Sequence, residues 1–504
     1  MSPMSLARSG TPPAAPDPTA DMNPLESPEA GARALRGGSL RTGGYALTIL
    51  LSLIAVPLLI RHLGIVGYGR YVTIVSLVTI VASLTEGGLN AIAIREYTTT
   101  RGEKRLQMMR DALGMRVVLT SVGALAAVGF SAAAGYGAPL VLGTALAATG
   151  MLLQLVQALL GVSLESELRF ASLTAVELLR QVVNVLLIVV LVLSGAGVVV
   201  LLGVAIPASA VSLLATVLLV RGRLSLQPVF VVRRWWPLVR DSAPWALVAA
   251  VNVVYFRLAI ILMSIVATAV QTGYFATSLR VVEVLVGVPA MAVGAAYPIL
   301  TRTAHADRDR FSYVSGRLFE LSLVTGAWMV MCIEVGAPFV IHVLAGHRGD
   351  PAIAVLRIQG LAVLATFLAV GCGFPLLTLR HFRVVVLANG AALVLSAALT
   401  LALVGQLGAR GAAIAAVAAE FLMALVQVRA LARASVTVRL DPLSFPAVLI
   451  PAVLATGIGL ALPVHPLIGI AVGTVVYTFL LFLSGRFPPE IREIAAVRLG
   501  THVR

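Results

Sequence analysis

The sequence is poor in charged residues, in aromatic residues and in cysteine. Only 12% of its 504 residues are charged and 6% are aromatic, whereas soluble globular domains have about 25% charged residues. An ordinary soluble fold is therefore excluded. The two cysteines, Cys332 and Cys372, lie in apolar segments without ligand-like neighbours, and they predict neither a disulfide framework nor a zinc site. The seven histidines show no metal-binding spacing, so we expect no metal ion and no other cofactor.

Long apolar segments take the place of the missing charge. Hydrophobic residues make up 59% of the chain, and the mean hydropathy is +0.99. Apolar runs of about 20 residues, each long enough to cross the hydrocarbon core of a bilayer as a helix, alternate with short polar breaks. A β-barrel would need alternating ten-residue strands, which these continuous runs are not. We therefore predict an all-α integral membrane protein with about fourteen transmembrane helices, at 43–60, 72–94, 115–133, 138–161, 172–193, 197–220, 244–266, 274–298, 319–343, 353–378, 384–405, 411–430, 444–462 and 466–485.

The positive charge is unevenly distributed between the predicted connections. Of the 37 Arg and Lys residues, the odd-numbered connections hold only Arg61, Arg70, Arg348 and Arg410. The second connection alone holds Arg95, Arg101, Lys104, Arg105, Arg110 and Arg116. Under the positive-inside rule this distribution places both termini in the cytosol. The net charge of +15 then reflects topology, no nucleic-acid partner is expected, and the arginine-rich, lysine-poor composition favours a bacterial cytoplasmic (inner) membrane.

Two equivalent motifs indicate an internal duplication. Gly67-Tyr68 lies between the first two predicted helices, and Gly273-Tyr274 lies between the seventh and the eighth. Two lobes of six helices, with a site at their interface, are the plan of a parallel-repeat transporter. We predict a disordered cytosolic N-terminal tail (1–42), an N-terminal six-helix lobe (43–220), a basic cytosolic linker (221–243), a C-terminal six-helix lobe (244–430), an additional helix pair (431–485) and a cytosolic C-terminal tail (486–504).

Five stretches of the chain carry a family resemblance: "IRHLGIVGYGRY" (60–71), "LTEGGLNAIAIRE" (84–96), "VQTGYFATSLRVVEVLVGVPAMAVGAAYPIL" (270–300), "VIHVLAGHRGDPAIAVLRIQGLAVL" (340–364) and "LGARGAAIAAVAAE" (407–420). Together they resemble the polysaccharide-transporter (Wzx-like) flippases of the multidrug/oligosaccharidyl-lipid/polysaccharide exporter superfamily. The resemblance implies a non-enzymatic activity, in which two lobes around a central cavity carry a polyprenyl-pyrophosphate-linked oligosaccharide from the inner to the outer leaflet by alternating access. One departure is that the acidic residue often found after the arginine of the seventh helix is absent, since the chain reads Arg257-Leu258-Ala259.

Several charged residues lie inside the predicted helices. A charge at the bilayer centre costs about 2.5–3.5 kcal/mol even on the lenient insertion scale, so such side chains are expected to face the bundle interior or a wet cavity. Glu177, Arg180 and Asn184 share one face of the fifth predicted helix, and Glu86 and Asn90 share one face of the second. The candidate substrate-binding residues are Arg257, Arg280, Arg180, Asn184 and Asn90, and the candidate ion-coupling carboxylates are Glu86, Glu177 and Glu283.

These charges allow two interpretations. Glu177 with Arg180, and Arg280 with Glu283, are i, i+3 neighbours that can form structural ion pairs. Arg257 has no acidic residue within a turn on its own helix, so it needs a partner from elsewhere. That partner is either an anionic ligand such as a pyrophosphate, which guanidinium groups bind bidentately, or a carboxylate across the cavity. The candidate carboxylates are Glu86 and Glu334.

The sequence leaves two other functions open. A multidrug or organic-cation antiporter of the same superfamily would need an acidic, aromatic cavity, whereas aromatic residues are scarce here. An integral-membrane glycosyltransferase or polymerase would need a polar catalytic loop at the outer face, and the odd-numbered connections are short. The partners expected for a flippase are the lipid bilayer, the lipid-linked glycan, a coupling proton or sodium ion, and the glycosyltransferases and polymerase of the same pathway.

Overall fold

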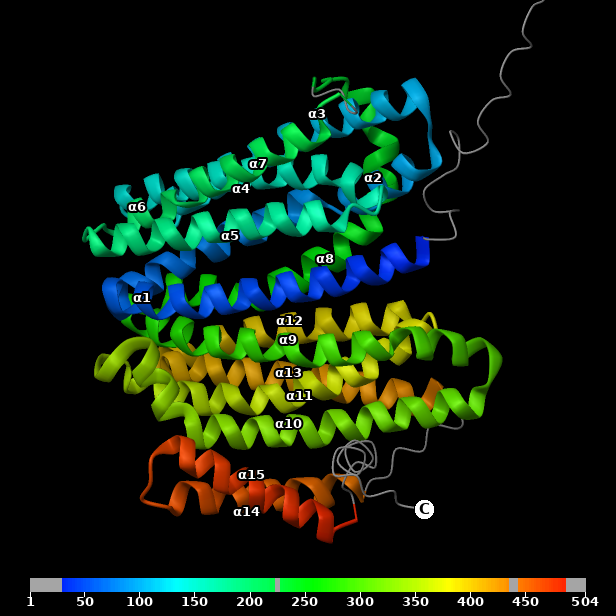
Figure 1. Cartoon of the computed structure of the whole chain (residues 1–504). Coiled ribbons are helices and arrows are strands. Elements are labelled where there is room, and N and C mark those ends of the chain that lie inside the picture. The colour runs from blue at the N-terminus through cyan, green and yellow to red at the C-terminus, as the bar shows by residue number, and fades with distance from the viewer. Residues whose placement is uncertain (1–29, 223–226, 435–442, 486–504) are drawn as a thin grey trace, which may run out of the picture.

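The computed structural model describes residues 30–222, 227–434 and 443–485, which form a bundle of helices with no β-strand among them (Figure 1). Eleven helices in this part of the chain are long and apolar enough to cross a membrane. Fewer than fourteen qualify partly because the first two predicted spans fall within one segment, Leu50–Thr99, and the seventh qualifies only as a shorter apolar helix, Ala250–Val266. The predicted all-α integral membrane fold is confirmed. The predicted C-terminal tail (486–504) and residues 1–29 of the predicted N-terminal tail lie outside the described residues.

The first seven helices form the N-terminal lobe. They are α1 (Ala30–Glu86), α2 (Leu89–Thr99), α3 (Gly102–Ala133), α4 (Ala138–Ser166), α5 (Phe170–Leu193), α6 (Val198–Gly203) and α7 (Ala205–Val220). α1 begins at Ala30, upstream of the predicted boundary at 43. It consists of two helical arms that meet at a kink at Gly64, where φ is 67° and ψ is 175°, a conformation that side chains other than glycine rarely adopt.

Six further α-helices and one 3-10 helix form the C-terminal lobe. They are α8 (Val232–Val266), α9 (Ala269–Ala306), α10 (Arg308–Ala345), η1 (Gly346–Gly349), α11 (Pro351–Thr378), α12 (Phe382–Leu407) and α13 (Ala409–Ala434). Side chains cap the N-termini of α9 and α10. The Thr268 hydroxyl accepts a hydrogen bond from the Gln271 backbone amide, and the Asp307 carboxylate accepts one from the Arg310 backbone amide. Such caps satisfy amide groups that have no partner inside the helix, and they determine where α9 and α10 begin.

The predicted linker (221–243) is partly helical and packs on the N-terminal lobe. Its Val229 amide donates a hydrogen bond to the Arg110 carbonyl oxygen at 3.1 Å. Trp235, in the first turn of α8, is buried with Tyr97 in an apolar cluster of the N-terminal lobe. Further along the same helix, Tyr255 is buried in the core of the C-terminal lobe. α8 therefore packs against both lobes, and it begins at Val232, inside the predicted linker.

The last two described helices, α14 (Ser444–Ala461) and α15 (Pro466–Leu483), form the additional pair. They lie against α10 on the side of the C-terminal lobe that faces away from the N-terminal lobe (Figure 1). The Trp328 indole N–H of α10 donates to the Thr474 hydroxyl at 3.1 Å, and the Tyr477 hydroxyl donates to the Val324 carbonyl oxygen at 2.9 Å. The pair therefore extends the C-terminal lobe and lies away from the interface between the lobes.

The two helix connections that carry the equivalent motifs Gly67-Tyr68 and Gly273-Tyr274 lie against each other, and we call them the two elbows. A Cβ atom on Gly69 of α1 would lie 2.8 Å from the Gly273 amide nitrogen of α9, and one on Gly273 would lie 2.1 Å from the Ile65 carbonyl oxygen. At the same end of the bundle, the Tyr136 hydroxyl contacts the Ser264 hydroxyl of α8 at 2.5 Å. We call this end, where Gly69 meets Gly273, the elbow end. Here the two lobes are in direct backbone contact, which only residues without a side chain permit.

The charge distribution predicts that the elbow end faces the outside of the cell and that both termini face the cytosol. In a variant without Cys332 and Cys372, a cysteine replacing Ser194 is expected to react with a membrane-impermeant thiol reagent in intact cells, because Ser194 is exposed in an odd-numbered connection. Cysteines replacing Glu103 or Asp307, which are exposed in even-numbered connections, are expected to react only after the membrane is opened. The opposite labelling pattern would invert this topology.

Candidate functional site

Arg257, Arg280 and Glu283 form one ion-pair cluster on two neighbouring helices. Arg257 of α8 places Nη1 2.6 Å from Glu283 Oε1 of α9, and Arg280 places Nη1 3.2 Å from Glu283 Oε2. All three side chains are between 20% and 33% exposed, so they are neither fully buried nor free in solvent. One carboxylate thus neutralises one of two guanidinium groups, and one positive charge remains in excess. We call these three residues the Arg257–Glu283–Arg280 cluster.

The cluster lines a cavity of about 210 Å³ that both lobes bound. Ser52, Gln181 and Asn184 face it from α1 and α5 of the N-terminal lobe, and the Gln181 amide nitrogen donates to the Ser52 hydroxyl at 3.1 Å. Tyr68 and Tyr71, from the second arm of α1, also line it, with their rings stacked at a centroid distance of 6.4 Å. The structure therefore brings four predicted site residues to one cavity between the lobes: Asn184, Arg257, Arg280 and Glu283.

Two further cavities meet at the same cluster. One, of about 330 Å³, has mostly apolar walls from α1, α9 and α10, including Val56, Leu285 and Val340, and Arg280 and Glu283 line it as well. The other, of about 320 Å³, is lined by residues of α8 and α9, including Phe256 and the cluster's Arg257 and Glu283, together with Thr79 of α1. Glu283 lines all three cavities. The charged cluster thus lies where a polar chamber borders an apolar groove.

The partner of Arg257 is a carboxylate that the sequence interpretation did not name. Glu334 lies instead near Arg357, whose Nε is 3.8 Å from its carboxylate, and Glu86 accepts a hydrogen bond from the Asn90 side chain at 3.0 Å. The suggestion of Glu86 or Glu334 as the partner across the cavity was therefore wrong. Arg257 and Glu283 lie on different helices, and helical spacing does not reveal which residues of two helices face each other.

The remaining predicted site residues lie elsewhere in the N-terminal lobe. Arg180 pairs with Glu177 on α5, as the i, i+3 spacing predicted. Glu177 and Asn90 line a separate cavity of about 410 Å³ among α1, α2, α4 and α5. Glu86 and Asn90, from the second predicted helix, do not line the central cavity.

Two buried polar groups escaped the sequence interpretation. Arg116, counted among the cytosolic basic residues, is fully buried and donates a hydrogen bond to Asn90 Oδ1 at 2.6 Å. Glu420 of α13 is 5% exposed and accepts hydrogen bonds from the Tyr255 and Thr366 hydroxyls, both at 2.9 Å. Glu420 received no role from the sequence; it connects α13 to α8 and α11. In each case the partners come from other helices, which no local pattern reveals.

The fold defines the class of protein: a two-lobed helical membrane protein with a cavity between the lobes. The structure titled "Lipid II flippase MurJ, inward closed conformation" is similar over 88% of this chain and 97% of that chain, with a TM-score of 0.73 and 10% sequence identity. An inward-facing multidrug resistance MATE family transporter of the MOP superfamily is similar over 77% of this chain and 95% of that chain, with a TM-score of 0.61 and 14% identity. At these identities the likeness establishes a shared fold.

The sequence itself establishes the family. A family model described as "Polysaccharide biosynthesis protein" matches residues 34–304, more than half of the chain, and the chain therefore belongs to this family. No curated protein matches the sequence significantly. Family membership agrees with the resemblance found in the sequence, and the fold is shared with known membrane transporters.

Proposed function

We propose that this protein carries a polyprenyl-pyrophosphate-linked oligosaccharide from the inner to the outer leaflet of a bacterial cytoplasmic membrane. The observation that carries this proposal is that Arg257 and Arg280, from two neighbouring helices, share the one carboxylate of Glu283 in a cavity that both lobes bound. A pyrophosphate offers more anionic oxygens than a carboxylate, and guanidinium groups bind phosphate oxygens bidentately. We infer that the pyrophosphate replaces Glu283 between the two arginines.

The surroundings of the cluster fit the two other parts of such a substrate. The apolar groove among α1, α9 and α10 offers walls of Val56, Leu285 and Val340 to a hydrocarbon tail, directly beside Arg280. The polar wall of the central cavity offers Gln181 and Asn184, whose amide groups can donate to and accept from sugar hydroxyls. Tail, headgroup and sugar would thus occupy three adjoining spaces, with the charge at their junction.

Transport then requires the two lobes to alternate around this cluster. They touch at the elbow end, and the substrate would enter from the opposite side. Among the described residues Glu283 is the carboxylate that lines the central cavity, so of the candidates Glu86, Glu177 and Glu283 it is the one whose ion pairs must change when an anion binds. A proton or a sodium ion, and the glycosyltransferases and polymerase of the pathway, remain the proposed further partners, and both termini are proposed to lie in the cytosol.

Binding of a defined lipid anion tests the proposal. Purified protein in lipid nanodiscs is expected to bind polyprenyl pyrophosphate more tightly than polyprenyl monophosphate. Glu283→Gln is expected to raise the affinity for the pyrophosphate roughly tenfold, because it removes the competing anion, and each hydrogen bond to a charged group is worth about 1.5–3 kcal/mol. The readout is the dissociation constant from titration with each lipid.

Glu334→Gln provides the matched control for this titration. Glu334 is a half-buried carboxylate whose arginine partner, Arg357, lies outside the cluster, so its replacement should leave the affinity unchanged. Equal affinity for the two lipids in every variant, together with tight binding of tetraphenylphosphonium by the wild type, would instead favour the organic-cation antiporter.

A further inference from the structure

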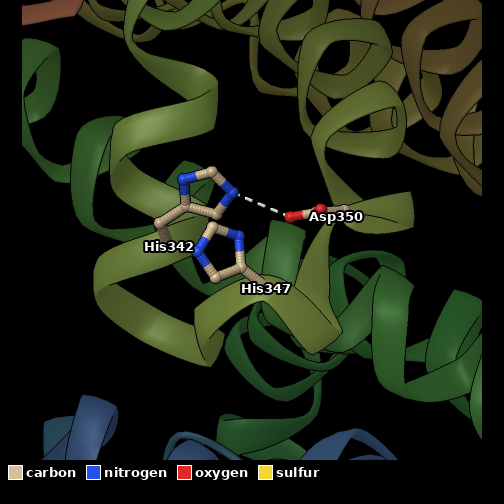
Figure 2. A group of neighbouring side chains, drawn as sticks. All are labelled: His342, His347 and Asp350. Carbon is tan, nitrogen blue, oxygen red and sulfur yellow. Dashed lines mark hydrogen bonds and ion pairs between the residues drawn. The ribbon is translucent and has the colours of Figure 1, made fainter. Parts of the chain in front are cut away.

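The connection between α10 and α11 brings three metal-ligating side chains together. His342 lies in the last turn of α10, His347 lies in η1, and Asp350 directly precedes α11 (Figure 2). α10 ends at Ala345, and Gly346 follows it with a φ of 63°, which turns the chain into η1. Gly349 is buried against the preceding turn, because a Cβ atom there would lie 2.7 Å from Ala345 Cβ. The turn is therefore compact and holds the three side chains on a defined backbone.

The donor atoms of these side chains are already grouped as a metal ion would need them. One ligand atom from each residue can be chosen so that all three lie within 4.8 Å of one another. His342 Nε2 is 2.7 Å from Asp350 Oδ1, and the His342 and His347 rings lie 4.6 Å apart between centroids. Tetrahedral Zn²⁺ with bonds of about 2.0–2.2 Å separates its ligand atoms by roughly 3.3 Å. Small side-chain rotations would bring all three donors to these positions.

A hydrogen bond between His342 and Asp350 accounts for only two of the three residues. The third, His347, is exposed, and among the described residues the structure shows no hydrogen bond to its side chain. Its ring lies beside that of His342. Two positively charged imidazoles at this distance would repel each other. A shared cation that takes one nitrogen from each ring gives both histidines a function in the same place.

We propose that His342, His347 and Asp350 bind one divalent transition-metal ion of the Zn²⁺ type, with water in the fourth position. Imidazole nitrogens suit Zn²⁺ and its neighbours in the first transition row, whereas Ca²⁺ and Mg²⁺ prefer sites made of oxygen ligands. Two histidines, one carboxylate and water make a common four-coordinate zinc set. The inference is independent of the transported substrate, since these three residues are separate from the cavity cluster.

The site lies where the C-terminal lobe supports α1. Arg61 Nη2 of α1 donates to the His342 carbonyl oxygen at 3.1 Å. Leu344 and Ala345, between the ligands, pack against an apolar cluster that contains Tyr68 of α1. A bound ion would tie the end of α10 to the start of α11 and thereby stiffen the surface on which α1 rests. Metal binding should therefore stabilise the folded protein.

Direct metal titration tests this inference. The full-length protein, purified in detergent with an affinity tag that contains no histidine and stripped with a chelator, is titrated with ZnCl₂, and bound zinc is measured after equilibrium dialysis. We expect one Zn²⁺ per chain, retained in the presence of excess Mg²⁺ and Ca²⁺, and a higher melting temperature with zinc. His347→Ala is expected to weaken zinc binding by at least about tenfold and to abolish the rise in melting temperature.

Two further variants make the result decisive. Asp350→Asn removes the anionic ligand while preserving the side-chain shape, and it is also expected to weaken binding. His381→Ala removes an exposed histidine at the start of α12, away from this turn, and is expected to bind zinc as the wild type does. The assignment is overturned if the wild type binds no zinc. It is also overturned if the wild type, His347→Ala and Asp350→Asn bind zinc equally, as an adventitious ion elsewhere on the chain would.

Discussion

Arg257→Ala is expected to lower export of the host's surface glycan at least about tenfold while leaving the amount of protein in the membrane unchanged. Export falls because the pyrophosphate loses one of its two guanidinium partners, and hydrogen bonds to charged groups contribute about 1.5–3 kcal/mol each. Abundance is preserved because Glu283 keeps Arg280 as a partner at 3.2 Å, so no intramembrane carboxylate is left unpaired. The measurements are surface glycan and membrane protein level in a strain whose own copy is deleted.

Two companion variants separate the substrate role from a structural one. Arg257→Lys is expected to keep part of the activity, because the charge remains while the planar guanidinium fork is lost. Arg357→Ala removes another half-buried arginine that is paired with a glutamate, and it is expected to leave export near the wild-type level. Normal export by stably inserted Arg257→Ala protein would falsify the assignment of Arg257 to the substrate site.

Gly273→Leu is expected to abolish export by preventing contact between the lobes at the elbow end. The first side-chain atom at position 273 would lie 2.1 Å from the Ile65 carbonyl oxygen, which is backbone and cannot rotate away. The lobes must therefore separate there, and a transporter that cannot close on one side cannot complete its cycle. The separation can be measured with a cysteine in place of Ser264, which contacts Tyr136 of the other lobe: it should react faster with a thiol reagent in the Gly273→Leu background.

Gly129→Leu is the matched control for this substitution. Gly129 of α3 is exposed, and a Cβ atom there meets nothing within 4 Å, so the same glycine-to-leucine change should leave both export and the labelling of position 264 unchanged. If Gly273→Leu supports normal export, direct contact of the two elbows is not a step of the transport cycle.

Local spacing identified ion pairs within one helix and missed those between helices. Glu177 with Arg180, and Arg280 with Glu283, pair as predicted, because residues three apart on a helix are neighbours whatever surrounds them. The link from Arg257 to Glu283 depends instead on how α8 and α9 are rotated against each other, and no property of either segment alone specifies that rotation.

Local spacing also failed to show which predicted site residues face the central cavity. Glu86 and Asn90 were predicted to share one helical face, but α1 ends at Glu86 and α2 begins at Leu89, with Gly87 and Gly88 at positive φ between them. Asn90 still donates to Glu86, and it accepts a hydrogen bond from buried Arg116. Neither Glu86 nor Asn90 lines the central cavity. The three proposed metal ligands lie together although the sequence did not predict it. His342, His347 and Asp350 follow no helical or known metal-binding spacing, and the 3-10 turn beginning at Gly346 brings them together.

The sequence by itself determined the all-α membrane fold, because every apolar run of this length must satisfy its backbone hydrogen bonds within a helix. It also singled out the repeated motifs Gly67-Tyr68 and Gly273-Tyr274. It singled out Arg257 and Arg280 as well, since a charge inside an apolar helix is costly enough to stand out from its surroundings. Only the tertiary structure decided that Glu283 bridges Arg257 and Arg280 and that Gly69 meets Gly273. These contacts join residues far apart in the chain or on different helices, and they depend on the packing of whole helices, to which every side chain along their length contributes.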